Sequence, residues 1–379
     1  MTPDKEIALL AELAALDRDK QPFLDDGIEF SPTDRYTDPD RFTRERTHIL
    51  SAFVQPLVHS SELAGPGSFL RREFQGHALL ITRDDDGNPH IFHNVCRHRG
   101  TRLVDEAHGC KRRFSCPYHA WTWSNNGQLV AIPHRAEGFP GLDDAALGLK
   151  RLGCSERYGW IWVNPTGEYP PDVDQQLGGL AGDFAWFHAE DHELLHRQEK
   201  TYRVNWKIVA EGGLESYHFR VAHRNTIGPY FLDNLSSYEQ FGPHIRSVLA
   251  RKSLRDLSSI PPDERQLRDH AQVLYTLLPG TALLVQSDHI AWIHINAVAV
   301  DTTKITVNTL VPAASVCTTQ HQEHWARNHQ ITVDTLAEDF EIGESIQAGL
   351  SSGANETLTF GRFEGALARY NKTVDALIG

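Results

Sequence analysis

Two short Cys/His pairs constrain what this chain can fold into more than any other feature. The first pair is Cys96 and His98, the second is Cys116 and His119, and seventeen residues separate them. Cysteine thiolates bind iron–sulfur clusters and zinc, and imidazole binds zinc and iron. Each pair offers one ligand of each type, which fits a [2Fe–2S] cluster in which two histidines replace two cysteines on one iron. The pattern therefore predicts a domain that holds such a cluster between two loops.

A structural zinc site is the alternative, because zinc also binds two cysteines together with two histidines. In finger-type zinc sites, however, the two cysteines come first as C-x2-4-C and the two histidines follow as H-x3-5-H. Each pair here is mixed, so the spacing favours the iron–sulfur cluster. A brown protein with visible absorption would exclude zinc.

Length and charge narrow the class of protein. A chain of 379 residues is long enough for two domains. The net charge of −13 argues against a nucleic-acid or anionic-membrane partner. No apolar run is long enough to span a bilayer and no signal peptide is evident, which predicts a cytoplasmic protein. Cys110, Cys154 and Cys317 are too few for a disulfide framework and are expected to be free thiols.

Short strands and turns dominate residues 47–165. Polar, glycine-containing runs at 84–88 and 125–127 separate apolar segments, and each predicts a β-hairpin. We expect a small all-β domain over 47–165 that presents both Cys/His pairs on loops.

The remaining segments predict an α+β fold with a second, larger domain over 166–379. We expect antiparallel strands at 281–286, 290–300 and 304–311, followed by a long helix at about 318–350. An N-terminal helical segment, 1–46, is expected to pack with this domain, with a helix at 4–18 and an irregular connection at 22–45.

A second metal site is indicated by His218 and His223. A one-electron carrier needs an acceptor, and two histidines with one carboxylate form the facial set that binds non-haem Fe(II). On a helix through 332–350, Asp339 falls in the middle of the apolar stripe, whereas Glu338, Glu341 and Glu344 fall on the solvent face. A carboxylate on an apolar stripe needs a partner, which is either this iron or a backbone cap or arginine.

Both motifs resemble those of the Rieske non-haem iron oxygenases, the terminal oxygenase components (alpha subunits) of ring-hydroxylating and demethylating systems. Cys-Arg-His-Arg-Gly at 96–100 and Cys-Pro-Tyr-His-Ala-Trp at 116–121 are similar to the Rieske box, and 205–223 is similar to the catalytic motif. The resemblance implies a small all-β Rieske domain and a helix-grip catalytic domain with a curved antiparallel sheet. It implies a [2Fe–2S] cluster on Cys96, His98, Cys116 and His119, and Fe(II) on His218, His223 and Asp339.

The resemblance also implies a catalytic role for Glu215. In the family, an acidic residue three positions before the first iron-binding histidine bridges to a cluster histidine of the neighbouring subunit. This implies that Glu215 links His119 of one chain to His218 of the next, in a homo-oligomer that is most simply a trimer. Most members have aspartate there, and glutamate resembles the subgroup that attacks quaternary ammonium compounds such as carnitine or betaines.

The expected function is that of a terminal oxygenase. The chain has no glycine fingerprint for a nicotinamide or flavin, so electrons from NAD(P)H must arrive through a partner ferredoxin or flavin reductase. The first expectation is hydroxylation of a small aromatic compound, as in aromatic hydrocarbon catabolism, by mono- or dioxygenation. Oxidative cleavage or N-demethylation of a quaternary ammonium compound is the second, and a Rieske electron carrier without oxygenase activity is the third.

Two further groups of residues are candidates for binding. Basic residues near the cluster form either a docking patch for an acidic ferredoxin or a solvated loop surface; they are Arg97, Arg99, Arg102, Lys111, Arg112 and Arg113. Six side chains are candidates to line a substrate pocket, with core packing as the alternative for most; they are Tyr202, Trp206, Tyr230, Phe231, His289 and Trp292.

Overall fold

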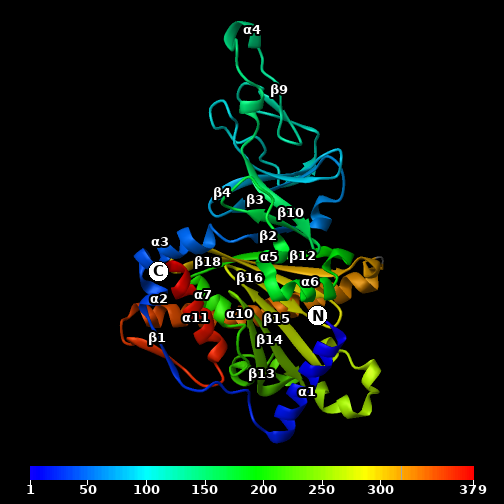
Figure 1. Cartoon of the computed structure of the whole chain (residues 1–379), viewed down its shortest axis with the longest axis vertical. Helices are drawn as coiled ribbons and strands as arrows, with labels where there is room; N and C mark the ends of the chain where they lie inside the picture. Colours follow the sequence, from blue (N-terminus) through cyan, green and yellow to red (C-terminus); the bar gives the residue numbers. More distant parts are fainter. Residues whose placement is uncertain (317) are drawn as a thin grey trace. The chain divides into compact units, whose positions relative to one another are not determined.

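The computed structural model describes residues 1–316 and 318–379, and these form two compact units. The large unit comprises Met1–Leu50 and Leu177–Gly379, and the small unit comprises Ser51–Gln176. In Figure 1 the small unit runs from light blue to green. Cys317, expected to be a free thiol, lies outside the described residues.

The small unit is built from antiparallel strands. Its larger sheet has the order β2-β11-β10-β5-β4-β3-β6, and its smaller sheet has the order β7-β8-β9. The strands are β2 (Gln55–His59), β3 (Ser68–Phe74), β4 (His77–Arg83), β5 (Pro89–His93), β6 (His108–Cys110), β7 (Arg113–Ser115), β8 (Thr122–Ser124), β9 (Leu129–Ala131), β10 (Arg151–Arg157) and β11 (Trp160–Asn164). Both predicted hairpins are confirmed, because β4 pairs with β5 and β8 pairs with β9.

The first hairpin shows how residues close in sequence determine the turn between β4 and β5. Asp84 closes the turn by accepting hydrogen bonds from the backbone N–H groups of Asp86 at 3.0 Å and Asn88 at 2.8 Å. Gly87 has a φ of +88°, which a residue with a side chain rarely adopts. The two strands therefore meet in a fixed register, and the loop that carries Cys96 follows directly after β5.

The large unit is organised around a seven-stranded antiparallel sheet in the order β12-β18-β17-β16-β15-β14-β13. Its strands are β12 (His192–Tyr202), β13 (Phe231–Phe241), β14 (His244–Arg251), β15 (Ala271–Leu277), β16 (Thr281–Val285), β17 (Ile290–Ala299) and β18 (Thr302–Pro312). Helix α10 (Thr319–Ser351) follows the sheet and contacts β12 and β18. The three predicted strands and the predicted long helix are confirmed.

The N-terminal segment differs in part from its prediction. Helix α1 (Pro3–Asp19) forms as expected, but the connection predicted at 22–45 also holds β1 (Glu29–Pro32), α2 (Asp34–Thr37) and α3 (Pro39–Glu45). Asp38 caps α3 and Pro39 occupies its first turn, so the composition that predicted a connection is that of a helix start. Strand β1 forms because β19 (Thr357–Phe360), far along the chain, pairs with it.

A buried polar network ties this segment to the rest of the large unit. The Lys207 ammonium on α7 (Trp206–Glu211) lies 2.7 Å from Glu45, and burial lowers the pKa of Lys207 to about 8. Tyr36 and Asn371 donate hydrogen bonds to Glu211, and burial raises the pKa of Glu211 to about 7. Figure 1 shows α2 and α3 in blue beside α11 (Gly365–Ile378) in red. Helix α7 is thereby fixed from both ends of the chain.

No helix among the described residues combines the length and apolar character that crossing a bilayer requires.

Candidate metal centres

The small unit brings its four predicted ligands together. Cys96 and Cys116 are both buried, and the rings of His98 and His119 lie 4.8 Å apart between centroids. The Nδ1 atoms of both histidines are buried and have no hydrogen-bond partner among the residues that the structure describes. A buried ring nitrogen without a partner is costly, so these two atoms fit metal ligands rather than packed core residues.

Backbone N–H groups donate to both sulfurs, but the pKa values of the two thiols shift in opposite directions. The backbone N–H of His98 donates to the Cys96 sulfur at 3.4 Å. Burial raises the pKa of the Cys96 thiol, and the neighbouring Cys116 adds to the rise. Burial also acts to raise the pKa of Cys116, but backbone N–H donors from Tyr118 and His119 outweigh it and leave that pKa below its ordinary value. Two thiols, two free imidazole nitrogens and backbone donors to sulfur are the donor set that a [2Fe–2S] cluster with mixed ligation needs.

Aromatic rings hold the two cluster histidines in place. The ring of Trp121 stacks on that of His98 with a centroid distance of 4.9 Å and an interplanar angle of 4°. The exposed ring of Tyr118 lies 3.7 Å from that of His119. Trp121 also belongs to the apolar cluster that contains Cys96 and Cys116, so the core of the unit supports the loops directly.

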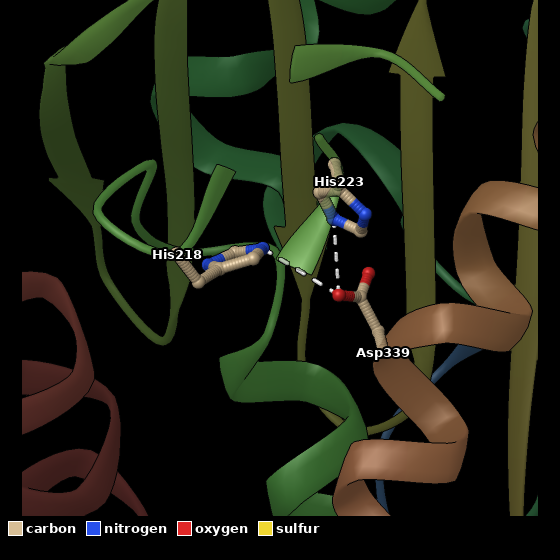
Figure 2. Close-up of side chains that lie close together, drawn as sticks. All are labelled: His218, His223 and Asp339. Carbon is tan, nitrogen blue, oxygen red and sulfur yellow. Dashed lines mark ion pairs between the residues drawn. The ribbon is translucent and has the colours of Figure 1, made fainter. Parts of the chain in front are cut away.

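The large unit brings His218, His223 and Asp339 together. One carboxylate oxygen of Asp339 lies 3.5 Å from Nε2 of His218 and 3.0 Å from Nε2 of His223. Figure 2 shows His218 on the left and His223 above, with a dashed line from each ring to the same oxygen of Asp339, which projects from a helix at the lower right. One ligand atom from each of the three residues can be chosen so that all lie within 4.8 Å of one another. This is the two-histidine, one-carboxylate set that binds non-haem Fe(II) with open positions.

Local structure sets the spacing of the three residues. His218 precedes and His223 follows α8 (Phe219–Ala222), a single turn that turns both rings inward, with 5.0 Å between their centroids. Helix α10 approaches closely because residue 343 is glycine, where an added Cβ would lie 3.1 Å from a methyl group of Val204. Asp339 lies one turn before this contact.

A carboxylate supports each of the two histidines from behind. Glu215 accepts a hydrogen bond from Nδ1 of His218, and Oε2 of Glu338 lies 2.8 Å from Nδ1 of His223. Burial acts to lower the pKa of both imidazoles, but Glu215 on His218, and Asp339 and Glu338 on His223, outweigh it and raise both values. With Nδ1–H donated to a carboxylate, each ring presents the lone pair of Nε2 to the centre.

The prediction that Glu338 faces solvent is wrong. Helical periodicity places it away from Asp339, but the segment after α8 covers that face of α10. Thr226, in this segment, donates a hydrogen bond of 2.7 Å to the same carboxylate oxygen. A helical projection shows only where a side chain points and cannot show which loop lies over it. The sequence clue was the acidic pair at 338–339 on the helix that supplies the ligand.

A cavity of about 220 Å³ adjoins the three residues. One wall is the sheet, where alternate residues of β14 to β17 face inward, and the other wall is formed by α7, α8 and α10. Most of the lining is aliphatic, and its aromatic members are Phe219 and Phe340. The apolar stripe predicted on α10 is confirmed as cavity lining, since Leu336, Ile342 and Ile346 face this space.

The six predicted pocket residues do not line this cavity. Tyr202 and Trp206 are buried in the core, Phe231 packs on Phe219, and Trp292 is also buried. Tyr230 is 67% exposed, and His289 bonds to Asp288. Packing therefore accounts for most of these residues, as the alternative interpretation held, and Tyr230 is a surface residue.

The basic residues near the cluster are partly neutralised. Arg102 pairs with Asp105, Lys111 with Glu106, and Arg112 with Asp85. Arg99 and Arg113 are exposed. The net positive charge of the patch is therefore smaller than its number of basic residues suggests, and its role in docking stays a prediction.

Comparison with known proteins identifies the family. The model of the ring hydroxylating alpha subunit (catalytic domain) matches residues 185–379, and the model of the Rieske [2Fe–2S] domain matches residues 53–150. The chain therefore belongs to the ring-hydroxylating alpha-subunit family, and its cofactors are a Rieske [2Fe–2S] cluster and a mononuclear iron.

Three similar proteins illustrate the relationship. The glycine betaine monooxygenase oxygenase subunit of Chromohalobacter salexigens is 30% identical over 58% of this chain and 49% of its own length. The anthranilate 1,2-dioxygenase large subunit of Acinetobacter baylyi is 28% identical over 53% of this chain and 44% of its own length. The matched segment thus spans about half of each relative. The solved structure of the quaternary ammonium Rieske monooxygenase CntA with an inhibitor shares the fold, with a TM-score of 0.80, 23% identity, and coverage of 93% of this chain and 96% of that chain.

Proposed function

We propose that the protein is the terminal oxygenase component of a Rieske system and that it oxidises a quaternary ammonium compound. The observation that carries the proposal is the triad of His218, His223 and Asp339 at the wall of an apolar cavity, in a chain that also holds a Rieske domain. In this proposal Cys96, His98, Cys116 and His119 bind the cluster, and the triad binds Fe(II). An Fe(II) held by two imidazoles and one carboxylate supplies oxygen activation when it is bound.

The residues of the chain prepare this centre in a defined way. Glu215 and Glu338 fix the two histidines as Nδ1–H tautomers, so that neither ring needs to rotate when the metal binds. The aliphatic lining gives the apolar part of the substrate a surface to pack on beside the triad. The pure electron carrier is disfavoured because it would need neither the triad nor the cavity.

Electron supply is part of the proposal. The protein would receive single electrons from a ferredoxin or a flavin reductase, with NAD(P)H as the ultimate donor. Oε1 of Glu215 contacts Nδ1 of His218, and Oε2 accepts hydrogen bonds from the backbone N–H groups of Tyr217 and His218, so a bridge to His119 of a neighbouring chain in a homotrimer would use the remaining lone pairs of this carboxylate. We propose this bridge as the route between cluster and iron.

Local charge supports a cationic substrate. Glu215 and Asp339 line the cavity, Glu338 lies directly behind His223, and no lysine or arginine is among the described residues that line it. Three carboxylates against one divalent iron leave a net negative charge, which favours a cation and opposes an anion. Phe219 and Phe340 line the cavity and are the candidates for a cation–π contact with a trimethylammonium group. The glycine betaine monooxygenase relative and the glutamate at 215 agree, so this class now ranks above the aromatic substrate expected first.

Hydroxylation of a neutral arene is the second candidate. The aliphatic wall formed by Leu274, Leu284, Ile293 and Ile295 would accept a flat apolar ring without any charged partner. The anthranilate dioxygenase relative shows that the family includes enzymes named for aromatic substrates.

An oxygen-uptake screen with a surrogate reductase tests both candidates. We expect trimethylammonium compounds to stimulate uptake and to yield either formaldehyde, from N-demethylation, or trimethylamine, from C–N cleavage. Uptake with arenes alone would reverse the ranking. Uptake that rises without oxygenated product, and ends as hydrogen peroxide for every compound, would contradict both.

A further inference from the structure

One polar side chain in the cavity wall has a fixed hydrogen-bonding direction. Gln272 on β15 is 5% exposed and faces the cavity, on the same side of its strand as Leu274 and Thr276. Its strand neighbour on β14 is Leu249, which also lines the cavity. An amide in such an aliphatic wall is costly unless its donors and acceptors are used.

The direction is set by an arginine outside the cavity lining. Arg251 donates a hydrogen bond to Oε1 of Gln286, and Nε2 of Gln286 donates to Oε1 of Gln272 at 3.3 Å. A guanidinium group can only donate, so Gln286 must turn its oxygen to Arg251 and its NH2 group to Gln272. The oxygen of Gln272 is thereby occupied, and its NH2 group remains as a donor toward the cavity.

The other polar side chains of the cavity wall have less hydrogen-bonding capacity left for a substrate. The Thr335 hydroxyl already donates to the backbone oxygen of Ile331 at 2.8 Å. Thr276 carries a hydroxyl that can donate or accept. Away from the metal centre, the cavity therefore offers a substrate one oriented amide donor and one hydroxyl.

Resting on the proposed function, we infer that the substrate is a quaternary ammonium compound whose other end is an uncharged hydrogen-bond acceptor, such as an alcohol, ester or amide. One amide donor and one hydroxyl satisfy a neutral oxygen. A carboxylate has about four acceptor positions, and among the described lining residues it would meet carboxylates but no cation. Gln272 is then a specificity-determining residue, and Arg251 and Gln286 are the residues that orient it.

Matched pairs of ligands test the inference. Trimethylammonium compounds with a carboxylate are compared with their methyl esters and primary amides, and with an alkyltrimethylammonium of equal length that lacks an acceptor. Dissociation constants are measured by calorimetry on the holoprotein, and kcat/KM is measured by oxygen uptake. We expect the esters and amides to bind at least about tenfold more tightly than the carboxylates, because a poorly matched buried charge costs more than a lost neutral hydrogen bond.

Variants separate the role of the amide from the shape of the cavity. Gln272→Leu is expected to weaken binding of esters and amides about tenfold while leaving the alkyltrimethylammonium unchanged. Gln286→Leu, which frees the oxygen of Gln272 but leaves the cavity lining intact, is expected to reduce the preference by a smaller factor. Gln198→Leu, exposed on β12, is the matched control, and the visible spectrum of the cluster reports folding in every variant.

Two results would overturn the inference, and they differ from a failure of the proposed function. Equal or tighter binding of the carboxylates, or an unchanged preference in Gln272→Leu, would remove the role of Gln272 while quaternary ammonium oxidation stands. Absence of binding and turnover for every quaternary ammonium compound, with arenes oxidised, would remove the proposed function and the inference with it.

Discussion

The two metal centres of this chain hold their histidines in different ways. In the described part of the chain, Nδ1 of His98 and of His119 has no hydrogen-bond partner, and the two rings contact those of Trp121 and Tyr118. His218 and His223 give Nδ1 to carboxylates and turn Nε2 inward. Stacking fixes a ring without adding charge, whereas a carboxylate fixes it and adds a negative charge beside the metal. The same residue type thus has different neighbours in the two units, as the proposed roles require: electron transfer through a cluster in one and a ligand-exchanging iron in the other.

Removing one proposed ligand from each centre should have the largest effect and tests whether the two centres are separate. Asp339→Ala is expected to abolish iron binding in the large unit and to reduce product formation to background, while the visible spectrum of the cluster is retained. Iron and acid-labile sulfide analysis checks both statements. Normal turnover in this variant would contradict the assignment of the iron site.

Cys116→Ser is the reciprocal change. The cluster is expected to be lost because a hydroxyl is a poor substitute for a thiolate ligand, and reduction by the partner protein should stop. The large unit should still take up one Fe(II) per chain, as measured by metal analysis. Retention of the cluster spectrum would show that Cys116 is not a ligand.

Glu338→Gln tests whether the carboxylate behind His223 matters. The amide keeps the shape but not the charge, so Fe(II) affinity or turnover is expected to fall by about 10–100-fold, as is usual for such supporting residues. Glu341→Gln, exposed on the same helix, is the matched control and should have no effect. If the two variants behave alike, the contact between Glu338 and His223 is structural only.

The pKa directions give the smallest expected effect, which is on metal loading. In metal-free protein burial acts to lower the pKa values of His218 and His223, but Glu215 beside His218, and Asp339 with Glu338 beside His223, outweigh burial and raise both values. Protonation of these histidines therefore contributes folding stability that is fully present below pH 6.5 and is lost as the pH rises through the raised pKa values. Iron must displace these protons, so below the raised pKa values the Fe(II) affinity should fall by up to about tenfold for each unit by which the pH is lowered, for each histidine that is protonated. Burial lowers the pKa of His98, so the same competition at the cluster should begin at a lower pH. Titration of metal-free protein by NMR checks that His98 has a lower pKa than His218 and His223, and Fe(II) binding at several pH values checks the competition.

The features that could be predicted from the sequence are those that depend on residues close together in the chain. The Cys/His spacing predicted a cluster domain, and the periodicity around Asp339 predicted an apolar stripe, three members of which line the cavity in the structure. The hairpin at 84–88 followed from Asp84 and Gly87, which act within a few residues of one another. These features need no knowledge of distant contacts.

The parts that were missed depend on contacts between distant segments. Glu338 meets His223 across 115 positions of sequence, and β1 exists only because β19 pairs with it. The cavity lining depends on the register between strands, such as Leu249 opposite Gln272, which no single-strand pattern specifies. Aromatic residues were therefore predicted as pocket members, although core packing explains most of them and Tyr230 is exposed.

The pairing of β1 with β19 also bears on how the protein is made. The small unit is inserted in the large one, so a ribosome finishes Ser51–Gln176 long before it supplies the last partner of residues 29–32. Units of a chain generally fold in the order of their synthesis. The sulfur-containing centre can thus mature first, while the unit proposed to take up the single ferrous ion is incomplete until residues 357–360 have been made.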